Sequence, residues 1–159
     1  MNAPIFADAS VHHVCLSVPD RDAAARWWGD MFGFEPEFTF EIAHIGARGG
    51  FLRKGAMRIE LFEVEGSAPA PLERRKPNTD LRTQGVKHVC FVVGDVQGAL
   101  ERAKAAGVAI VGVARGVGAP MREEADVGLR DGRAPATAFF LTDPWGALIE
   151  VLGRADFAA

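Results

Sequence analysis

The 159-residue sequence is ordinary in composition, with 48% hydrophobic residues, 25% charged residues and a net charge of −3. No basic surplus indicates a nucleic-acid partner, and no apolar run approaches the ~20 residues of a membrane-spanning helix. Met1 to Ser10 lack the basic and apolar regions of a signal peptide, and the two cysteines offer no disulfide framework. We therefore expect a soluble cytoplasmic protein that has neither nucleic acid nor membrane as a partner.

The chain is predicted to begin with a strand and a helix. Residues 11–18 are rich in β-forming side chains and stop at a Pro-Asp pair, which predicts a strand and then a turn. Asp20 is a suitable N-cap for a helix over 21–32, whose apolar residues recur at spacings of three and four. Gly33 stands where a left-handed C-cap residue is expected, so the helix should end there.

A period of two after the helix predicts three further strands. These strands cover 38–45, 50–54 and 57–64. Turns are predicted at Arg48–Gly50 and at Lys54-Gly55, where glycine interrupts the alternation. The first part of the chain is therefore expected to form a β-α-β-β-β module.

A connection rich in Pro, Ala and charged residues follows from 65 to 84, with one helical turn predicted near Leu72. The first pattern then recurs, with Asp95 as the N-cap of a helix over 96–106. The strands of this second module are predicted at 88–93, 108–113, 136–141 and 147–152. A turn at Asp143–Gly146 separates the last two strands.

One phrase occurs in both modules. Residues 13–20 (HVCLSVPD) and 88–95 (HVCFVVGD) are identical at five of eight positions, and each is followed later by an Ile-Glu pair. Strand alternation places the apolar residues of each phrase on one face, so His13 and His88 point to the other. By the same argument Glu60 and Glu150 lie on the open faces of their strands.

This matched set predicts a metal site. Neutral imidazole and carboxylate suit divalent Zn, Ni, Co, Mn or Fe(II), and two carboxylates cancel the charge of the ion. Four donors from four strands of a curved sheet can converge, and the remaining coordination positions would accept water or substrate oxygens. The predicted ligands are His13, Glu60, His88 and Glu150.

Several alternatives stay open. Cys15 and Cys90 share the face of the two histidines, so they either complete a His2Cys2 zinc site or line a cleft. His12 exchanges roles with His13 if the strand register is misjudged. The segment 114–135 lengthens the second module and forms either a lid or a disordered decoration. Further candidates for acids, bases or anion anchors are Glu41, His44, Arg48, Arg58 and Arg122.

The sequence resembles the vicinal oxygen chelate superfamily, which includes glyoxalase I, methylmalonyl-CoA epimerase, extradiol dioxygenases and bleomycin- and fosfomycin-resistance proteins. The similar stretches are 13–18 (HVCLSV), 27–34 (WWGDMFGF), 57–63 (MRIELFE), 88–93 (HVCFVV) and 140–150 (FLTDPWGALIE). The resemblance implies an α+β fold of two tandem β-α-β-β-β modules, which form a curved, U-shaped mixed sheet around a metal cleft. It covers one domain, 11–154, made of a module at 10–66, a linker at 67–84 and a module at 85–154.

The resemblance also maps the family's metal ligands onto the same four residues, and departures from the pattern limit the choice of member. Small bacterial glyoxalase I enzymes place a basic residue after the first His and an Asn after the first Glu, where this chain has Ser17 and Val64. Methylmalonyl-CoA epimerases commonly have Gln at the position of Glu60. Extradiol dioxygenases use two His and one Glu, which leaves that position unused.

By resemblance, the expected activity is that of a metal-dependent isomerase or lyase. Its small substrate would have vicinal oxygens or a carbonyl beside an acidic C–H, a divalent ion would stabilise the enolate, and Glu60 or Glu150 would abstract the proton. The alternatives are an Fe(II) extradiol-type dioxygenase using His13 or His88 with Glu150, and a non-catalytic binding or resistance protein. A homodimer is expected.

Overall fold

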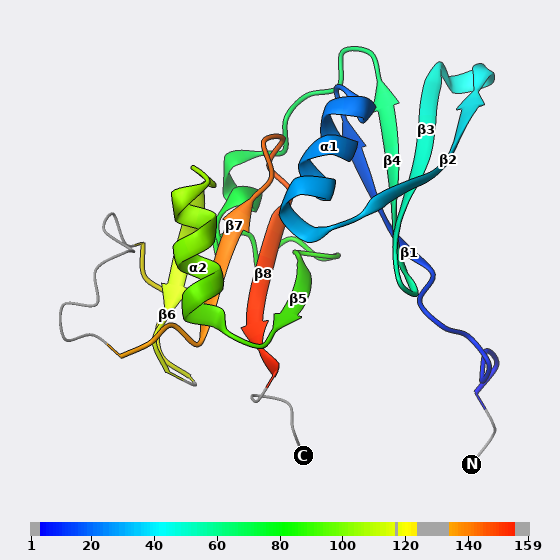
Figure 1. The fold of residues 1–159 in the computed structure, drawn as a ribbon. Helices are drawn as coiled ribbons and strands as arrows, with labels where there is room; N and C mark the ends of the chain where they lie inside the picture. Colours follow the sequence, from blue (N-terminus) through cyan, green and yellow to red (C-terminus); the bar gives the residue numbers. More distant parts are fainter. Residues whose placement is uncertain (1–3, 117, 124–133, 155–159) are drawn as a thin grey trace. The chain divides into compact units, whose positions relative to one another are not determined.

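The computed structural model of the chain describes residues 4–116, 118–123 and 134–154. The chain divides into two compact units, Met1–Ala68 and Pro69–Ala159. In the described residues each unit contains a four-stranded sheet with one α-helix (Figure 1). No described helix has the length and apolar character that crossing a membrane would require.

Unit 1 is a β-α-β-β-β module. Its elements are β1 (His13–Val18), α1 (Arg21–Phe32), β2 (Glu35–Ile42), the 3-10 helix η1 (Ala43–Ile45), β3 (Ala47–Lys54) and β4 (Met57–Val64). The strands lie in the order β1-β4-β3-β2, with β1 parallel to β4 and the other neighbours antiparallel. Helix α1 packs against β2, β3 and β4 on one face of this sheet.

Unit 2 repeats this arrangement. After the 3-10 helix η2 (Leu72–Arg75) come β5 (Val89–Val93), α2 (Val96–Ala105), β6 (Ile110–Ala114), β7 (Ala138–Thr142) and β8 (Leu148–Gly153). The strand order is β5-β8-β7-β6, with β5 parallel to β8, and α2 packs against β7 and β8. Two mixed sheets built from β-α-β-β-β modules confirm the predicted α+β class, and η2 is the predicted turn near Leu72.

Both helices begin at the predicted caps. The Asp20 carboxylate accepts a hydrogen bond from the Ala23 N–H at 2.8 Å, and Asp95 accepts one from Gly98 at 2.9 Å. Each bond satisfies an N–H that has no partner inside the first turn, which stabilises a helix by about 1 kcal/mol. Gly33 ends α1 in the left-handed region, at φ 70°.

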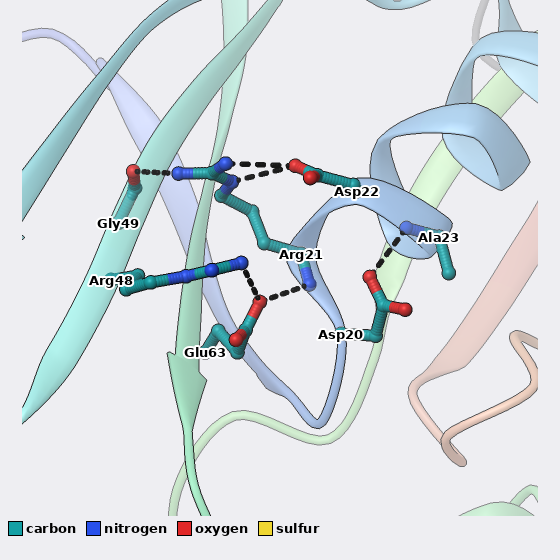
Figure 2. A network of polar contacts seen from close by, with 7 residues as sticks. All are labelled: Asp20, Arg21, Asp22, Ala23, Arg48, Gly49 and Glu63. Atoms are coloured by element: carbon teal, nitrogen blue, oxygen red, sulfur yellow. Dashed lines mark hydrogen bonds and ion pairs between the residues drawn. The ribbon is translucent and has the colours of Figure 1, made fainter.

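The start of α1 is fastened to the sheet by Glu63 (Figure 2). Its carboxylate accepts a hydrogen bond from the Arg21 backbone N–H at 2.9 Å and one from the Arg48 guanidinium at 2.8 Å. The Arg21 guanidinium donates to the Gly49 carbonyl and to the Asp22 carboxylate. These bonds join α1, β3 and β4 within unit 1.

The prediction of a turn at Arg48–Gly50 is wrong, because these residues lie inside β3. The reversal occurs instead at η1 and Gly46, whose φ is 64°. Side-chain crowding explains the two strand glycines: a Cβ on Gly49 would lie 2.2 Å from the Phe40 ring, and one on Gly50 would lie 3.1 Å from the Arg21 side chain. The glycines therefore mark close approach on the two faces of β3.

The predicted inward residues form the core. Val18, Ile59 and Leu61 in unit 1 are at most 1% exposed, and Trp28 of α1 is fully buried. In unit 2, Ile149 is fully buried. Burial of one such side chain is worth roughly 1.5–3 kcal/mol, so this pattern fixes which face of each strand packs under its helix. The opposite face carries the polar residues of interest.

Candidate functional site

In unit 1 the sheet brings His13 and Glu60 together. The His13 Nε2 lies 3.1 Å from the Glu60 Oε2, and the side chains are 34% and 15% exposed. The parallel register pairs Glu60 with Cys15, two residues beyond His13, so both side chains project from one face of adjacent strands. The contact between His13 and Glu60 follows from the pairing of β1 with β4 and from the alternation of side chains along each strand.

In unit 2 the same contact forms between His88 and Glu150. The His88 Nε2 lies 3.0 Å from the Glu150 Oε2, with exposed fractions of 35% and 19%. Glu150 pairs in register with Cys90, which again lies two residues beyond the histidine. His88 itself lies one residue before β5, whereas the sequence predicted it inside the strand.

The geometry of each pair is compatible with binding of a divalent metal ion. Two donor atoms that occupy adjacent octahedral positions at about 2.1 Å from an ion lie about 3 Å apart. Imidazole nitrogen and carboxylate oxygen are also suitable donors for a transition ion. Among the described residues, no three His, Cys, Asp or Glu side chains form a group that could hold a metal. Each pair alone therefore supplies two donors, and convergence of the four predicted ligands stays a prediction.

Each histidine also contacts a phenylalanine from the strand on the far side of the glutamate strand. The His13 and Phe51 rings are 5.3 Å apart between centroids with an interplanar angle of 88°, and His88 and Phe140 are 5.2 Å apart at 90°. Phe51 pairs in register with Glu60, and Phe140 with Glu150. In both units, therefore, the imidazole contacts a carboxylate and makes a T-shaped contact with a phenylalanine ring.

The two cysteines lie beside the carboxylates. Both are free and exposed. Desolvation by the surrounding protein, together with the adjacent Glu60 carboxylate, raises the pKa of the Cys15 thiol to about 11. Desolvation and Glu150 likewise raise the pKa of Cys90 to about 11. A thiol with such a pKa stays protonated at neutral pH. The Cys90 Sγ lies 3.8 Å from the Phe91 carbonyl oxygen, to which it can donate.

His12 lies outside this arrangement. It is exposed, and its Nδ1 lies 2.9 Å from the Nδ1 of His13. His13 is the histidine that contacts Glu60, as the alternation predicted. His44 lies in η1 and Glu41 in β2, and both are exposed.

The predicted anion anchors of unit 1 are paired with carboxylates. Arg48 contacts Glu63 at 2.8 Å. Arg58 donates two hydrogen bonds to Glu37, at 2.7 and 2.9 Å. Hydrogen bonding to Arg58 lowers the pKa of Glu37. Arg122, the candidate anchor in unit 2, forms an isolated antiparallel bridge with Val113 through its backbone.

Four phenylalanines on the open face of unit 1 were not predicted to belong to the site. We call them the aromatic platform, and they are Phe38, Phe40, Phe51 and Phe62. The centroid distances are 5.0 Å for Phe38–Phe51, 5.9 Å for Phe40–Phe51 and 5.8 Å for Phe40–Phe62. The Phe-Thr-Phe alternation of residues 38–40 was the available signal, but only the strand register shows that these rings share a face with Glu60.

The segment 73–87, predicted as a mere connection, borders His88. A pocket of about 80 Å³ lies between this segment and the sheet of unit 2, lined among others by Pro77, Asn78, Leu81, His88, Phe140 and Leu148. Asn78 adopts φ 65°, a conformation that asparagine tolerates better than most residues. Half of the segment 114–135, namely residues 117 and 124–133, lies outside the described residues, so its role as a lid or a decoration stays a prediction.

A family model and a curated relative both match this sequence. The family model of the glyoxalase/bleomycin resistance protein/dioxygenase superfamily matches residues 12–125. The ethylmalonyl-CoA/methylmalonyl-CoA epimerase of Cereibacter sphaeroides is 30% identical over 104 residues, which cover 64% of this chain and 74% of that protein.

Two solved structures show the same fold. The trypanothione-dependent glyoxalase I of Leishmania major has a TM-score of 0.63 at 17% identity, covering 94% of this chain and 89% of that chain. A variant of the fosfomycin resistance protein FosX from Listeria monocytogenes, in complex with Mn(II) and 1S,2S-dihydroxypropylphosphonic acid, has a TM-score of 0.56 at 15% identity. That similarity covers 92% of this chain and 93% of the other.

Proposed function

Because the chain belongs to the glyoxalase/bleomycin resistance protein/dioxygenase superfamily, we propose that it is a divalent-metal-dependent isomerase or lyase. Its substrate would be a small molecule with two vicinal oxygens, or with a carbonyl beside an acidic C–H. The observation that carries this proposal is the His–Glu contact, which is built twice in the same register, at 3.1 Å in unit 1 and 3.0 Å in unit 2.

The proposed metal ligands are His13, Glu60, His88 and Glu150. A divalent ion bound there would supply a Lewis acid for the substrate's oxygens. Two carboxylates and two neutral imidazoles suit such an ion in charge and donor type. The same His–Glu contacts can also be satisfied by a proton between nitrogen and oxygen, so metal titration is the deciding measurement.

The proposed base is one of the two glutamates. Glu60 or Glu150 would take the proton from the acidic carbon onto a carboxylate oxygen and return it to the same or a neighbouring carbon. In epimerisation, one glutamate would remove the proton and the other, in its protonated form, would donate a proton to the opposite face of the same carbon. Return of the proton by the same carboxylate to a neighbouring carbon is isomerisation. The neighbouring phenylalanine rings would restrict the orientation of the imidazoles.

A metal titration of the purified chain tests this proposal. We expect one Mn(II) or Co(II) per chain, with Glu60→Gln and Glu150→Gln each weakening binding by at least about tenfold. Two ions per chain, or unchanged binding in both variants, would contradict a shared four-residue site. The homodimer stays a prediction, which light scattering on the same samples tests.

Proton exchange tests the reaction class. Since the epimerase relative is named for methylmalonyl-CoA, we expect metal-dependent incorporation of solvent deuterium into that compound, or into a related acid with vicinal oxygens. Loss of either glutamate should slow the exchange by about 100-fold or more. Oxygen uptake with catechol and Fe(II), without such exchange, would favour the dioxygenase instead.

A further inference from the structure

We propose that the aromatic platform of unit 1 binds an aromatic ring of the substrate, while the substrate's two oxygens reach the His13–Glu60 pair. This inference rests on the proposed function and names a substrate class for it. The acid or carbonyl compound would therefore carry a flat apolar substituent beside its two oxygens.

The strand register places the platform and the candidate ligand on one face. Phe38 pairs with Phe51, Phe51 with Glu60, and Glu60 with Cys15, so one row crosses all four strands. Partners in adjacent strands project from the same face of a sheet. The ring of Phe51 is therefore the immediate neighbour of the Glu60 carboxylate, and the ring of Phe38 is the next one along the row.

The rings leave an apolar surface uncovered. Phe38 is 53% exposed, although it packs on Phe51 at 5.0 Å with a tilt of 32°. Phe40 and Phe51 are tilted by 37°, so three rings present a shallow surface that a planar group can stack on. Exposed apolar patches of this kind are characteristic of binding surfaces, because leaving them in water is unfavourable.

Gly49 keeps this surface shallow. A Cβ at that position would lie 2.2 Å from two atoms of the Phe40 ring, which therefore lies directly over the strand backbone. Any side chain at position 49 would push the ring outward. Because Gly49 has no side chain, the Phe40 ring lies closer to the sheet than it could if another residue stood at position 49.

Two arginines border the platform and share one carboxylate. Arg53 and Arg58 continue the next row of the sheet, and both contact Glu37, at 3.5 and 2.7 Å. Both guanidinium groups are engaged by this one carboxylate, so the three side chains keep one net positive charge, while the platform itself is formed by uncharged rings. In unit 2 the corresponding row ends at Gly112, where a Cβ would meet Met121 and Pro77, so that position is covered by other residues.

Two hydroxamates test the proposal, because both offer the same pair of oxygens and differ only in the substituent. Calorimetry with the Co(II)-loaded full chain would measure acetohydroxamate, which carries a methyl group, and benzohydroxamate, which carries a phenyl group. Stacking and burial of the ring should favour benzohydroxamate by at least about tenfold. In Phe38→Ala this preference should fall to within about threefold while acetohydroxamate binding is unchanged.

The controls separate the possible failures. Phe6→Ala removes another exposed phenylalanine, which is 78% exposed and lies before the first strand of the sheet, and should keep the preference. Phe40→Leu should reduce it as Phe38→Ala does. Equal affinities for the two hydroxamates would overturn the platform and leave the proposed function standing, whereas no binding of either would overturn both. A changed oligomeric state in Phe38→Ala with an unchanged preference would show that a second copy of the chain covers this face instead.

Discussion

The imidazole of His13 stands at 88° to the ring of Phe51, with their centroids 5.3 Å apart. His88 and Phe140 repeat this geometry at 90° and 5.2 Å, in a unit with its own sheet. Each phenylalanine also pairs in register with the glutamate that contacts the histidine, so the ring and the carboxylate reach the imidazole from adjacent strands on the same side. This repeated support suggests that ring orientation matters for metal binding.

Phe51→Leu should therefore weaken metal binding by about tenfold, the range seen when residues that orient a ligand are changed. The absorption spectrum of bound Co(II) should also shift, because the imidazole would be less restricted. Phe62→Leu is the matched control, since Phe62 lies on the same face in β4 and contacts Phe40 rather than His13. Equal affinities and spectra in the two variants would show that Phe51 only packs.

The cysteines are expected to be dispensable as ligands. Cys15 and Cys90 pair in register with Glu60 and Glu150, and a serine there keeps a small side chain with a donor beside each carboxylate. The double variant Cys15→Ser/Cys90→Ser should thus bind one metal ion with an affinity within about threefold of the original chain. A loss of about 100-fold or more would instead support the His2Cys2 zinc site.

Asp143 should give the stability of unit 2 a pH dependence. Its carboxyl group is buried in the turn between β7 and β8, and its Oδ1 accepts hydrogen bonds from the backbone of Trp145 and Ala147. Burial raises the pKa of Asp143 above its usual 3.8, despite these bonds. The folded chain consequently binds this proton more tightly than the unfolded chain, and the associated stability is lost as the pH rises through the folded-state pKa.

Asp143→Asn keeps the acceptor and removes the charge. The stability of the original chain relative to this variant should fall as the pH rises from about 4 and then become constant once Asp143 is ionised. Asp143→Ala removes the acceptor and should cost about 1–3 kcal/mol. Denaturant unfolding between about pH 4 and 8 measures both effects. If the stability of the original chain relative to Asp143→Asn rises with pH over this range, the pKa of Asp143 is not raised.

Glu63 should contribute to stability rather than to metal binding. Glu63→Ala leaves the Arg21 N–H and the Arg48 guanidinium without their acceptor, which should cost about 1–3 kcal/mol of unfolding free energy. The exposed Glu65 is the control, since Glu65→Ala should change stability by less than about 0.5 kcal/mol. Thermal unfolding distinguishes the two, and the metal affinity should be the same in both.

The faces of the strands could be predicted from the sequence because they depend on local alternation alone. Val18 and Ile59 are buried while His13 and Cys15 are exposed, as a period of two requires. The helix ends were also predictable, since Asp20 and Gly33 act through bonds within a few residues of themselves. Both contacts between histidine and glutamate follow from these faces once β1 and β5 pair with the correct neighbours.

Features that depend on distant residues could not be predicted. Gly49 and Gly50 suggested a turn, and only the positions of Phe40 and Arg21 explain why they lie within a strand. The aromatic platform depends on a register shift between Pro36 and Phe38, which no local pattern fixes. The segment 73–87 borders His88 because it packs on unit 2, which its Pro-rich composition did not indicate.

The most direct test of the four-residue metal site is a crystal structure of the Co(II)-loaded chain with anomalous diffraction data. We predict one ion within about 2.0–2.2 Å of donor atoms from His13, Glu60, His88 and Glu150 together. Separate ions on the two His–Glu pairs, an ion held by Cys15 and Cys90, or an ion bound away from these residues would contradict the site.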